Sequence, residues 1–117
     1  MFPRESVTTL FTLSLLISEK FKEIKIITTF QSRFGPQEWL QPYTDKTIEK
    51  LPSEGNKNIL VICPGFASDC VETLEEISIQ GKESFINSGG NNFDLIPCLN
   101  DSEDHIKLLS YLINKHI

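Results

Sequence analysis

Two glutamates on one face of a predicted helix are the most chemically suggestive feature of the sequence. Glu72 and Glu76 lie four residues apart in the stretch "PGFASDCVETLEEI" (64–77), so a helix there places one above the other. Neighbouring carboxylates can accept protons or bind a divalent cation such as ferrous iron. The same spacing is typical of a solvated helix face, which composition alone favours. The residues therefore leave open whether this face meets solvent or a partner that needs carboxylates.

The same stretch is a poor match to two other kinds of site. Cys70 lies near the helix start, where the helix dipole lowers a thiol pKa, but Asp69 and Glu72 beside it have the opposite effect. Neither His105 nor His116 has an evident route to this thiol, so a small apolar role is favoured over nucleophilic catalysis. Phosphate or dinucleotide binding requires a glycine-rich turn, and no loop after a predicted strand carries GxGxxG or GxxxxGK.

Length, charge and cysteine usage indicate a single intracellular domain. The chain has 117 residues, of which 39% are hydrophobic, enough for one domain over 1–117 with a modest core. Its net charge of −5 argues against nucleic acid as a partner. The apolar run at 7–17 is too short to span a bilayer, so no transmembrane segment is expected. The three cysteines have no CxxC spacing, which predicts reduced thiols, a cytoplasmic location and no iron–sulfur cluster.

Hydrophobic spacing predicts alternating helices and strands. The expected elements are helices at 5–21, 44–51, 68–87 and 105–117, and strands at 24–30, 58–64 and 92–99. This alternation predicts an α/β domain with a three-layer parallel sheet, flanking helices and right-handed crossovers. The loops that follow the strands should meet at one edge, where sheets of this class bind ligands. They are residues 31–36, 64–68 and 98–102. The acidic helix begins at that edge.

Local signals predict how several helices begin, end and face. Thr44 is expected as the N-cap of its helix, with Thr47 or Ile48 facing the core. Gly89 and Gly90 are expected to supply a left-handed cap after the acidic helix. The last helix carries one apolar stripe, formed by Ile106, Leu109, Leu112 and Ile113.

Three segments of the chain resemble the C-terminal half of ferrochelatase, in order and at that family's spacing. They are "TFQSRFGPQEWLQPYTDKTIEKL", "ICPGFASDCVETLEEI" and "IPCLNDSEDHI". The resemblance runs from about residue 7 to the end and is greatest to bacterial members. Ferrochelatase is a lyase of heme biosynthesis that inserts ferrous iron into protoporphyrin IX to form protoheme. The resemblance therefore implies ferrous iron and protoporphyrin IX as substrates, with no permanently bound cofactor.

The resemblance assigns roles to the acids of the predicted helix. Glu72 matches the family's glutamate that faces the porphyrin centre, which makes it a catalytic residue and a contact for the metal ion. Glu76 matches the next acid of a row that passes protons or metal, and the third position, usually acidic, is Gln80 here. The family's helix contains a π-type stretch, which would bring these positions further into line. Desolvation and the neighbouring carboxylate are expected to raise the pKa of Glu72.

Four further residues match positions around the macrocycle and are expected to contribute to porphyrin binding. Trp39 and Arg33 match positions that line the cleft, and Phe66 and Asp69 match an "F..D" pattern before the acidic helix. Flat contact with the macrocycle is the role implied for Phe66 and Trp39, with core packing as the alternative. Cys70 stands where many members have histidine, although bacterial members also carry cysteine there.

Parts of the family's pattern are missing from this sequence. Ferrochelatases are more than twice as long, with two similar lobes, and their catalytic histidine lies on an "FHG" strand upstream of the matched region. We therefore expect a partial chelatase-like domain that lacks this strand and the N-terminal lobe, with negligible activity unless a separate N-terminal half completes it. His105 and His116 match no catalytic position and are expected on the surface. The alternative is a non-catalytic remnant, or a weak metal- or tetrapyrrole-binding module.

Overall fold

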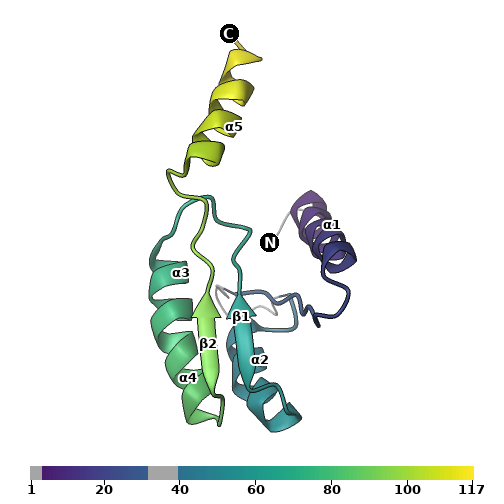
Figure 1. Cartoon of the computed structure of the whole chain (residues 1–117), viewed down its shortest axis with the longest axis vertical. Coiled ribbons are helices and arrows are strands. Elements are labelled where there is room, and N and C mark those ends of the chain that lie inside the picture. Colours follow the sequence, from purple (N-terminus) through teal and green to yellow (C-terminus); the bar gives the residue numbers. More distant parts are fainter. Residues whose placement is uncertain (1–3, 32–39) are drawn as a thin grey trace.

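The computed structural model describes residues 4–31 and 40–117, with side chains from residue 12 onward. The helices are α1 (Arg4–Lys20), α2 (Thr44–Lys50), the 3₁₀ helix η1 (Leu51–Glu54), α3 (Val71–Leu74), the π-helix η2 (Glu76–Gly81), α4 (Lys82–Asn87) and α5 (Glu103–Asn114). The strands are β1 (Asn58–Val61) and β2 (Asn92–Leu95) (Figure 1). None of the described helices is both long and apolar enough to cross a membrane. The order of helices and strands from α2 onward confirms the predicted alternation.

β1 and β2 pair in parallel and form a two-stranded sheet, as the alternation predicted. Val61 lies opposite Leu95 at the carboxyl end of the ladder. The helical segment from α3 to α4 connects the two strands and lies beside them (Figure 1). Both strands end earlier than predicted, short of Pro64 and Pro97, which have no backbone N–H to donate to a ladder. The mixed helix and strand content with a parallel sheet is that of an α/β domain.

The strand predicted at 24–30 is wrong. This segment is irregular, and its pairing within the described residues is an isolated bridge between Phe30 and Tyr43. The N–H of Phe30 donates to the carbonyl oxygen of Pro42 at 3.0 Å, and the N–H of Thr44 donates back to Phe30 at 3.0 Å. β-branched residues favour a strand only where a neighbouring strand supplies the ladder. The described residues thus contain one pair of strands, and the three-layer sheet stays a prediction.

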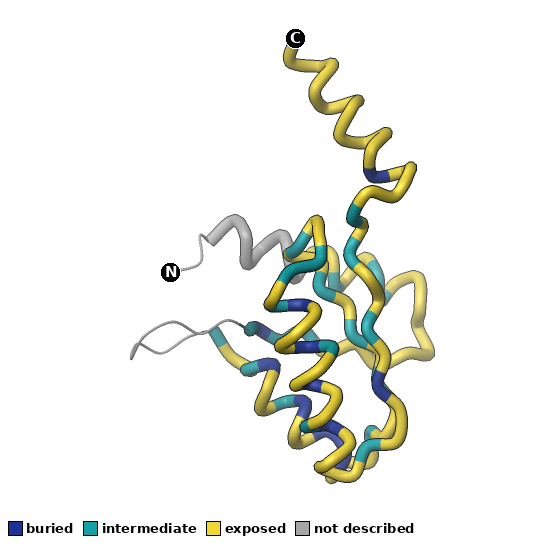
Figure 2. The backbone as a smooth tube through the Cα atoms, turned by 90° about the vertical axis from the view of Figure 1, so that its left-hand side faces the viewer, coloured by how far each residue is buried: buried dark blue, intermediate teal, exposed yellow. Residues whose placement is uncertain are grey.

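One hydrophobic core lies between the helices and the sheet. Its buried members are Ile48, Leu51, Ile77, Phe85 and Phe93. Phe85 is fully buried, and its ring centroid lies 5.8 Å from that of Phe93. Burying a phenylalanine side chain contributes about 1.5–3 kcal/mol, so this pair holds α4 against β2. Figure 2 shows the buried positions gathered in this part of the molecule, whereas α5 is exposed along most of its length.

Gly89 and Gly90 follow α4 for two different reasons. Gly89 has a φ of +104°, so it supplies the left-handed conformation that was predicted. Gly90 does not share this conformation, and the prediction of a left-handed role for it is wrong. A Cβ at Gly90 would collide with the ring of Phe85. Glycine is required there because the backbone passes directly against the most deeply buried aromatic side chain.

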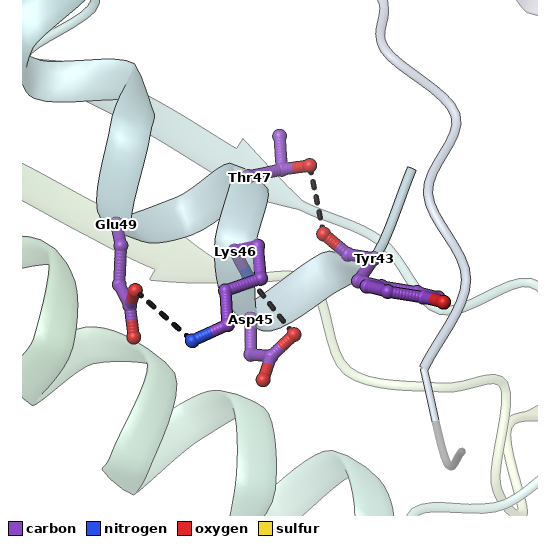
Figure 3. A network of polar contacts seen from close by, with 5 residues as sticks. All are labelled: Tyr43, Asp45, Lys46, Thr47 and Glu49. Carbon is purple, nitrogen blue, oxygen red and sulfur yellow. Dashed lines mark hydrogen bonds and ion pairs between the residues drawn. The ribbon is translucent and has the colours of Figure 1, made fainter. Parts of the chain in front are cut away.

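α2 begins at Thr44 as predicted, but the N-cap predicted at Thr44 is wrong. Tyr43, with an extended backbone, is the N-cap, and Thr44 is already the first helical residue. The carbonyl oxygen of Tyr43 accepts the backbone N–H of Thr47 at 3.0 Å and its hydroxyl at 2.8 Å (Figure 3). The hydroxyl of Thr44 is instead buried and donates to the hydroxyl of Thr29 at 2.8 Å. Ile48 faces the core as predicted.

α5 presents its apolar stripe to the surface. The stripe residues are between 41% and 60% exposed; they are Ile106, Leu109, Leu112 and Ile113. His116 is exposed, as predicted. The surface position predicted for His105 is wrong, because its ring is buried and its Nδ1 lies 2.6 Å from the carbonyl oxygen of Asn100. This contact ties the first turn of α5 to the loop before it.

Candidate active site

The loops after β1 and β2 run side by side at the carboxyl edge of the sheet (Figure 1). The N–H of Ile96 donates to the carbonyl oxygen of Val61 at 2.8 Å, just beyond the ladder. Further along, the N–H of Asn100 donates to the carbonyl oxygen of Ala67 at 2.9 Å. The acidic helix starts from the first of these loops. The predicted convergence of these two loops is therefore confirmed.

Asp69 joins the two loops. Its Oδ2 accepts hydrogen bonds from Nδ2 of Asn100 at 2.8 Å and from the N–H of Cys98 at 3.2 Å. Its Oδ1 accepts one from the hydroxyl of Thr73 at 2.9 Å, and its own N–H donates to Oδ1 of Asn100 at 2.8 Å. These bonds, the one from Asn100 first, lower the pKa of Asp69. Both carboxylate oxygens therefore have partners within the chain.

Glu72 is half-buried in the first turn of α3. Its carbonyl oxygen accepts a hydrogen bond from Nε2 of Gln31 at 3.0 Å, which places Gln31 at the same edge. Hydrogen bonding by the Cys70 side chain, ahead of that by the Glu72 backbone N–H, lowers the pKa of Glu72. The prediction of a raised pKa is wrong for this chain, because these hydrogen bonds outweigh desolvation. At neutral pH Glu72 is a carboxylate.

The acidic helix contains a π turn, as the resemblance implied. The N–H of Gln80 donates to the carbonyl oxygen of Glu75, five residues earlier, at 2.9 Å. Buried positions recur every four residues through this turn, at 73, 77, 81 and 85. In an α-helix of 3.6 residues per turn, each such step would rotate the stripe by about 40°. The wider π turn offsets part of that rotation and keeps the stripe against the core.

Glu76 lies one turn beyond Glu72 and is exposed. Each of these acids comes one residue before a member of the buried stripe, so both lie on the face beside it. Gln80, which precedes the buried Gly81, continues the same face. The helix thus carries two carboxylates and an amide on this face.

The structure describes two of the four residues that were predicted to contact the macrocycle, Phe66 and Asp69. Phe66 is half-buried in the turn after β1, where its N–H donates to the carbonyl oxygen of Cys63 at 3.2 Å. Asp69 lies at the edge but is engaged with the neighbouring loop. Arg33 and Trp39 lie outside the described residues. The edge therefore brings together Phe66, Asp69 and Glu72, with Glu76 one turn further along.

Comparison with known proteins decides the family. The family model described as Ferrochelatase matches residues 5–117, almost the whole chain. The chain belongs to the ferrochelatase family. The ferrochelatase of Chelativorans sp. (strain BNC1) is 57% identical over 95 residues, which cover 81% of this chain and 27% of that protein. The ferrochelatase of Yersinia pestis (strain Pestoides F) is 58% identical over 93 residues, covering 80% and 29%. The chain thus spans less than a third of the length of these curated relatives.

This member of the ferrochelatase family has no preformed set of metal ligands in the part of the chain that the structure describes. There, no cluster of three or more His, Cys, Asp or Glu side chains is placed to hold a metal ion. Cys63, Cys70 and Cys98 are free thiols. Burial raises the pKa of Cys98 to about 11 and also raises that of Cys63, so both stay protonated and are poor metal ligands.

Three residues that were not predicted as site residues shape this ferrochelatase-family site. Thr73 is fully buried, and its hydroxyl accepts the N–H of Cys70 at 3.0 Å while it bonds to Asp69. Asn100 has a φ of +49°, a left-handed conformation, and holds Asp69. His105 is the third, buried against that turn. One weak signal was available, since asparagine tolerates the left-handed region and stands just before a predicted helix.

Proposed function

We propose that this chain supplies the carboxylate face of a ferrochelatase, an enzyme that inserts ferrous iron into protoporphyrin IX in heme biosynthesis. The observation that carries the proposal is the row formed by Glu72 and Glu76 along a π-containing helix that starts at the carboxyl edge of the sheet. Membership of the ferrochelatase family supplies the reaction. The geometry supplies groups suited to it.

The reaction needs groups that handle protons and water ligands together. The porphyrin gives up its two pyrrole protons, and the hydrated Fe²⁺ exchanges water for the pyrrole nitrogens, so one dication replaces two protons. A carboxylate at position 72 can accept a pyrrole proton or take the place of a water on the metal ion. Because hydrogen bonding lowers the pKa of Glu72, it meets the substrate already ionised. Glu76 then relays the proton away from the macrocycle.

Binding of the macrocycle would make Glu72 a stronger base. An apolar ring over the carboxylate excludes water and raises its pKa. The acid is therefore ionised in the free chain and gains proton affinity in the complex. This order favours proton capture after the porphyrin has bound, when the proton comes from the pyrrole nitrogen.

The aromatic and basic residues of the cleft contribute contact and not proton transfer. Phe66, in the turn beside the acidic helix, offers a flat surface to the macrocycle, and the family resemblance assigns macrocycle contact to Trp39 and Arg33 as well. Asp69 differs from these three, because both of its carboxylate oxygens accept hydrogen bonds within the chain. These hydrogen bonds support a role for Asp69 in shaping the cleft and not in direct contact with the porphyrin.

The architecture around this site is that of a chelatase-like domain with a three-layer parallel sheet, completed by further polypeptide. Large apolar side chains at the surface support this. Leu60 is 64% exposed, Ile62 is 51% exposed and Ile79 is 62% exposed. Exposed apolar patches of this kind mark surfaces that pack against another segment. The strand with the catalytic histidine and the N-terminal lobe are the partners we assign to them, in a cytoplasmic enzyme with reduced thiols.

A chimera tests the function. Residues of this chain replace the matching 93-residue segment of the Yersinia pestis relative. The chimera should insert iron into protoporphyrin IX, and Glu72→Gln should lower its rate by about 100-fold or more, the usual worth of a positioned general base. Glu83→Gln, an exposed acid on α4, is the matched control and should retain the rate. A chimera that binds protoporphyrin but inserts iron equally well with Glu72→Gln would contradict the proposal.

Binding without turnover is the second candidate for the chain on its own. It is favoured because the chain covers less than a third of the length of its relatives. The isolated chain should then bind protoporphyrin IX with negligible iron insertion. Iron insertion by the chain alone that is lost on Glu72→Gln would exclude this second candidate.

A further inference from the structure

The turn before α5 is built around one asparagine. Asn100 occupies the left-handed region, with φ of +49°, where asparagine is tolerated far better than most residues. Its side chain uses both of its functional groups on Asp69. Nδ2 donates to Oδ2 of Asp69 at 2.8 Å, and Oδ1 accepts the Asp69 N–H at 2.8 Å. The two residues are 31 positions apart, so this pair fixes the loop after β2 to the loop after β1.

A buried histidine holds the same turn from the other side. His105 is 8% exposed, while the other residues of α5 are exposed. Its Nδ1 lies 2.6 Å from the carbonyl oxygen of Asn100. A carbonyl oxygen only accepts, so Nδ1 carries the proton in this contact. The ring therefore connects the first turn of α5 to the backbone of Asn100.

Asp69 is in turn hydrogen-bonded to the helix that carries Glu72 and Glu76. Its Oδ1 accepts the hydroxyl of Thr73, the fully buried residue directly after Glu72. The same hydroxyl accepts the N–H of Cys70, two residues before Glu72, at 3.0 Å. Thr73 thus connects the first helical turn, which contains Glu72, to Asp69.

We propose that Asn100 and His105 are positioning residues for Glu72. They hold Asp69, and Asp69 in turn holds the first turn of α3, so that the seating of α5 determines where the Glu72 carboxylate lies. The effect on iron insertion rests on the proposed function, but the placement of Glu72 does not. Neither Asn100 nor His105 needs to touch the porphyrin or the metal ion.

The test follows the ionisation of Glu72 itself. Asn100→Gly keeps the left-handed turn and removes both bonds to Asp69 without adding a charge. The Glu72 side-chain carboxyl, labelled with ¹³C, is titrated by NMR in the 117-residue chain. Its midpoint should rise in Asn100→Gly, because the first turn loosens and the hydrogen bonding that lowers the Glu72 pKa weakens. Asn91→Gly, the same change at an exposed position at the other end of the strands, should leave the midpoint where it is in the wild type.

An exchange of the two side chains provides the rescue. Asp69→Asn and Asn100→Asp, combined, keep the net charge and restore one donor facing one carboxylate. The Glu72 midpoint in this double variant should lie closer to wild type than in either single variant. A purely structural loop contact would instead lower the melting temperature without moving the midpoint.

Each result decides the proposal. An unchanged Glu72 midpoint in a folded Asn100→Gly chain overturns it. If Asn100→Gly gives no cooperative melt, the double exchange decides, and loss of folding there too assigns the network to general stability and overturns the proposal. A wild-type chain that fails to bind protoporphyrin IX refutes the proposed function alone, since the titration requires no porphyrin.

Discussion

The backbone N–H of Gln80 bonds to the carbonyl oxygen of Glu75, and this π-type contact sets the two faces of the acidic helix. On the core side, Gly81 lets the turn pack closely. A Cβ at Gly81 would lie 3.3 Å from the carbonyl oxygen of Glu76 and 3.5 Å from the ring of Phe93. The acids keep their direction because the opposite side of the helix is fixed against the core.

Gly90→Ala should destabilise the chain by about 1–3 kcal/mol, the usual cost of overpacking a core. The added methyl group would collide with the buried ring of Phe85. Urea unfolding followed by circular dichroism measures the change. Gly65→Ala is the matched control, because a Cβ there meets nothing within 4 Å. Equal stability of the two variants would contradict the described packing of Phe85.

The register of the sheet can be tested by two truncations on opposite faces. Phe93→Ala removes a core ring that is 4% exposed and should cost about 3–5 kcal/mol. Leu60→Ala, on the other face of the neighbouring strand and 64% exposed, should change the stability of the isolated chain little. Urea midpoints compare the two variants. A larger loss for Leu60→Ala would mean that the strands face the other way.

Acidification should weaken the junction at Asp69. A carboxyl whose pKa is lowered on folding contributes stability that is complete above its unfolded value, about 4, and is lost as the pH falls through the folded value. The melting temperature should therefore drop below about pH 4. Asp69→Asn should melt lower at neutral pH and decline less steeply in acid, whereas the exposed Asp101→Asn should follow the wild type. Parallel acid profiles for Asp69→Asn and wild type would contradict the junction.

Cys98 should be slow to alkylate in the folded chain. Burial, followed by its bond to Asp69, raises its pKa from 9.0 to about 11. At pH 8 the reactive thiolate is then roughly 100-fold scarcer than for an ordinary thiol, since each pKa unit is a factor of ten. Iodoacetamide labelling, read by mass spectrometry, should speed up by about this factor when the chain is unfolded in urea. Equal rates in the folded and unfolded chains would show that the thiol is accessible.

Hydrophobic spacing in the sequence predicts most of the helices and strands correctly. α1, α2, β1, β2 and α5 lie where hydrophobic spacing places them, within a few residues. The segment 24–30 has the composition of a strand, but pairing depends on a neighbour that the segment does not contain. Thr44 has the right type for an N-cap, yet its hydroxyl is used by Thr29, a contact that arises only when the chain folds back.

In the candidate site, too, local features can be predicted from the sequence, whereas contacts between distant residues cannot. The spacing of Glu72 and Glu76 is visible in the sequence, and the family resemblance supplies their roles. The sign of the Glu72 pKa shift depends on hydrogen bonding by the Cys70 side chain, which is a matter of side-chain placement. The partnership of Asp69 with Asn100 links distant loops, and two polar residues give no sequence signal that they will meet.

The most direct test of the account is thermal melting of the 117-residue chain, followed by far-UV circular dichroism with and without protoporphyrin IX. The account predicts one cooperative transition that moves to higher temperature with increasing protoporphyrin, because a ligand that binds only the folded state stabilises it. Glu83→Gln should show the same shift. A broad transition that protoporphyrin leaves unchanged would contradict the claim that this chain carries an organised porphyrin-binding face.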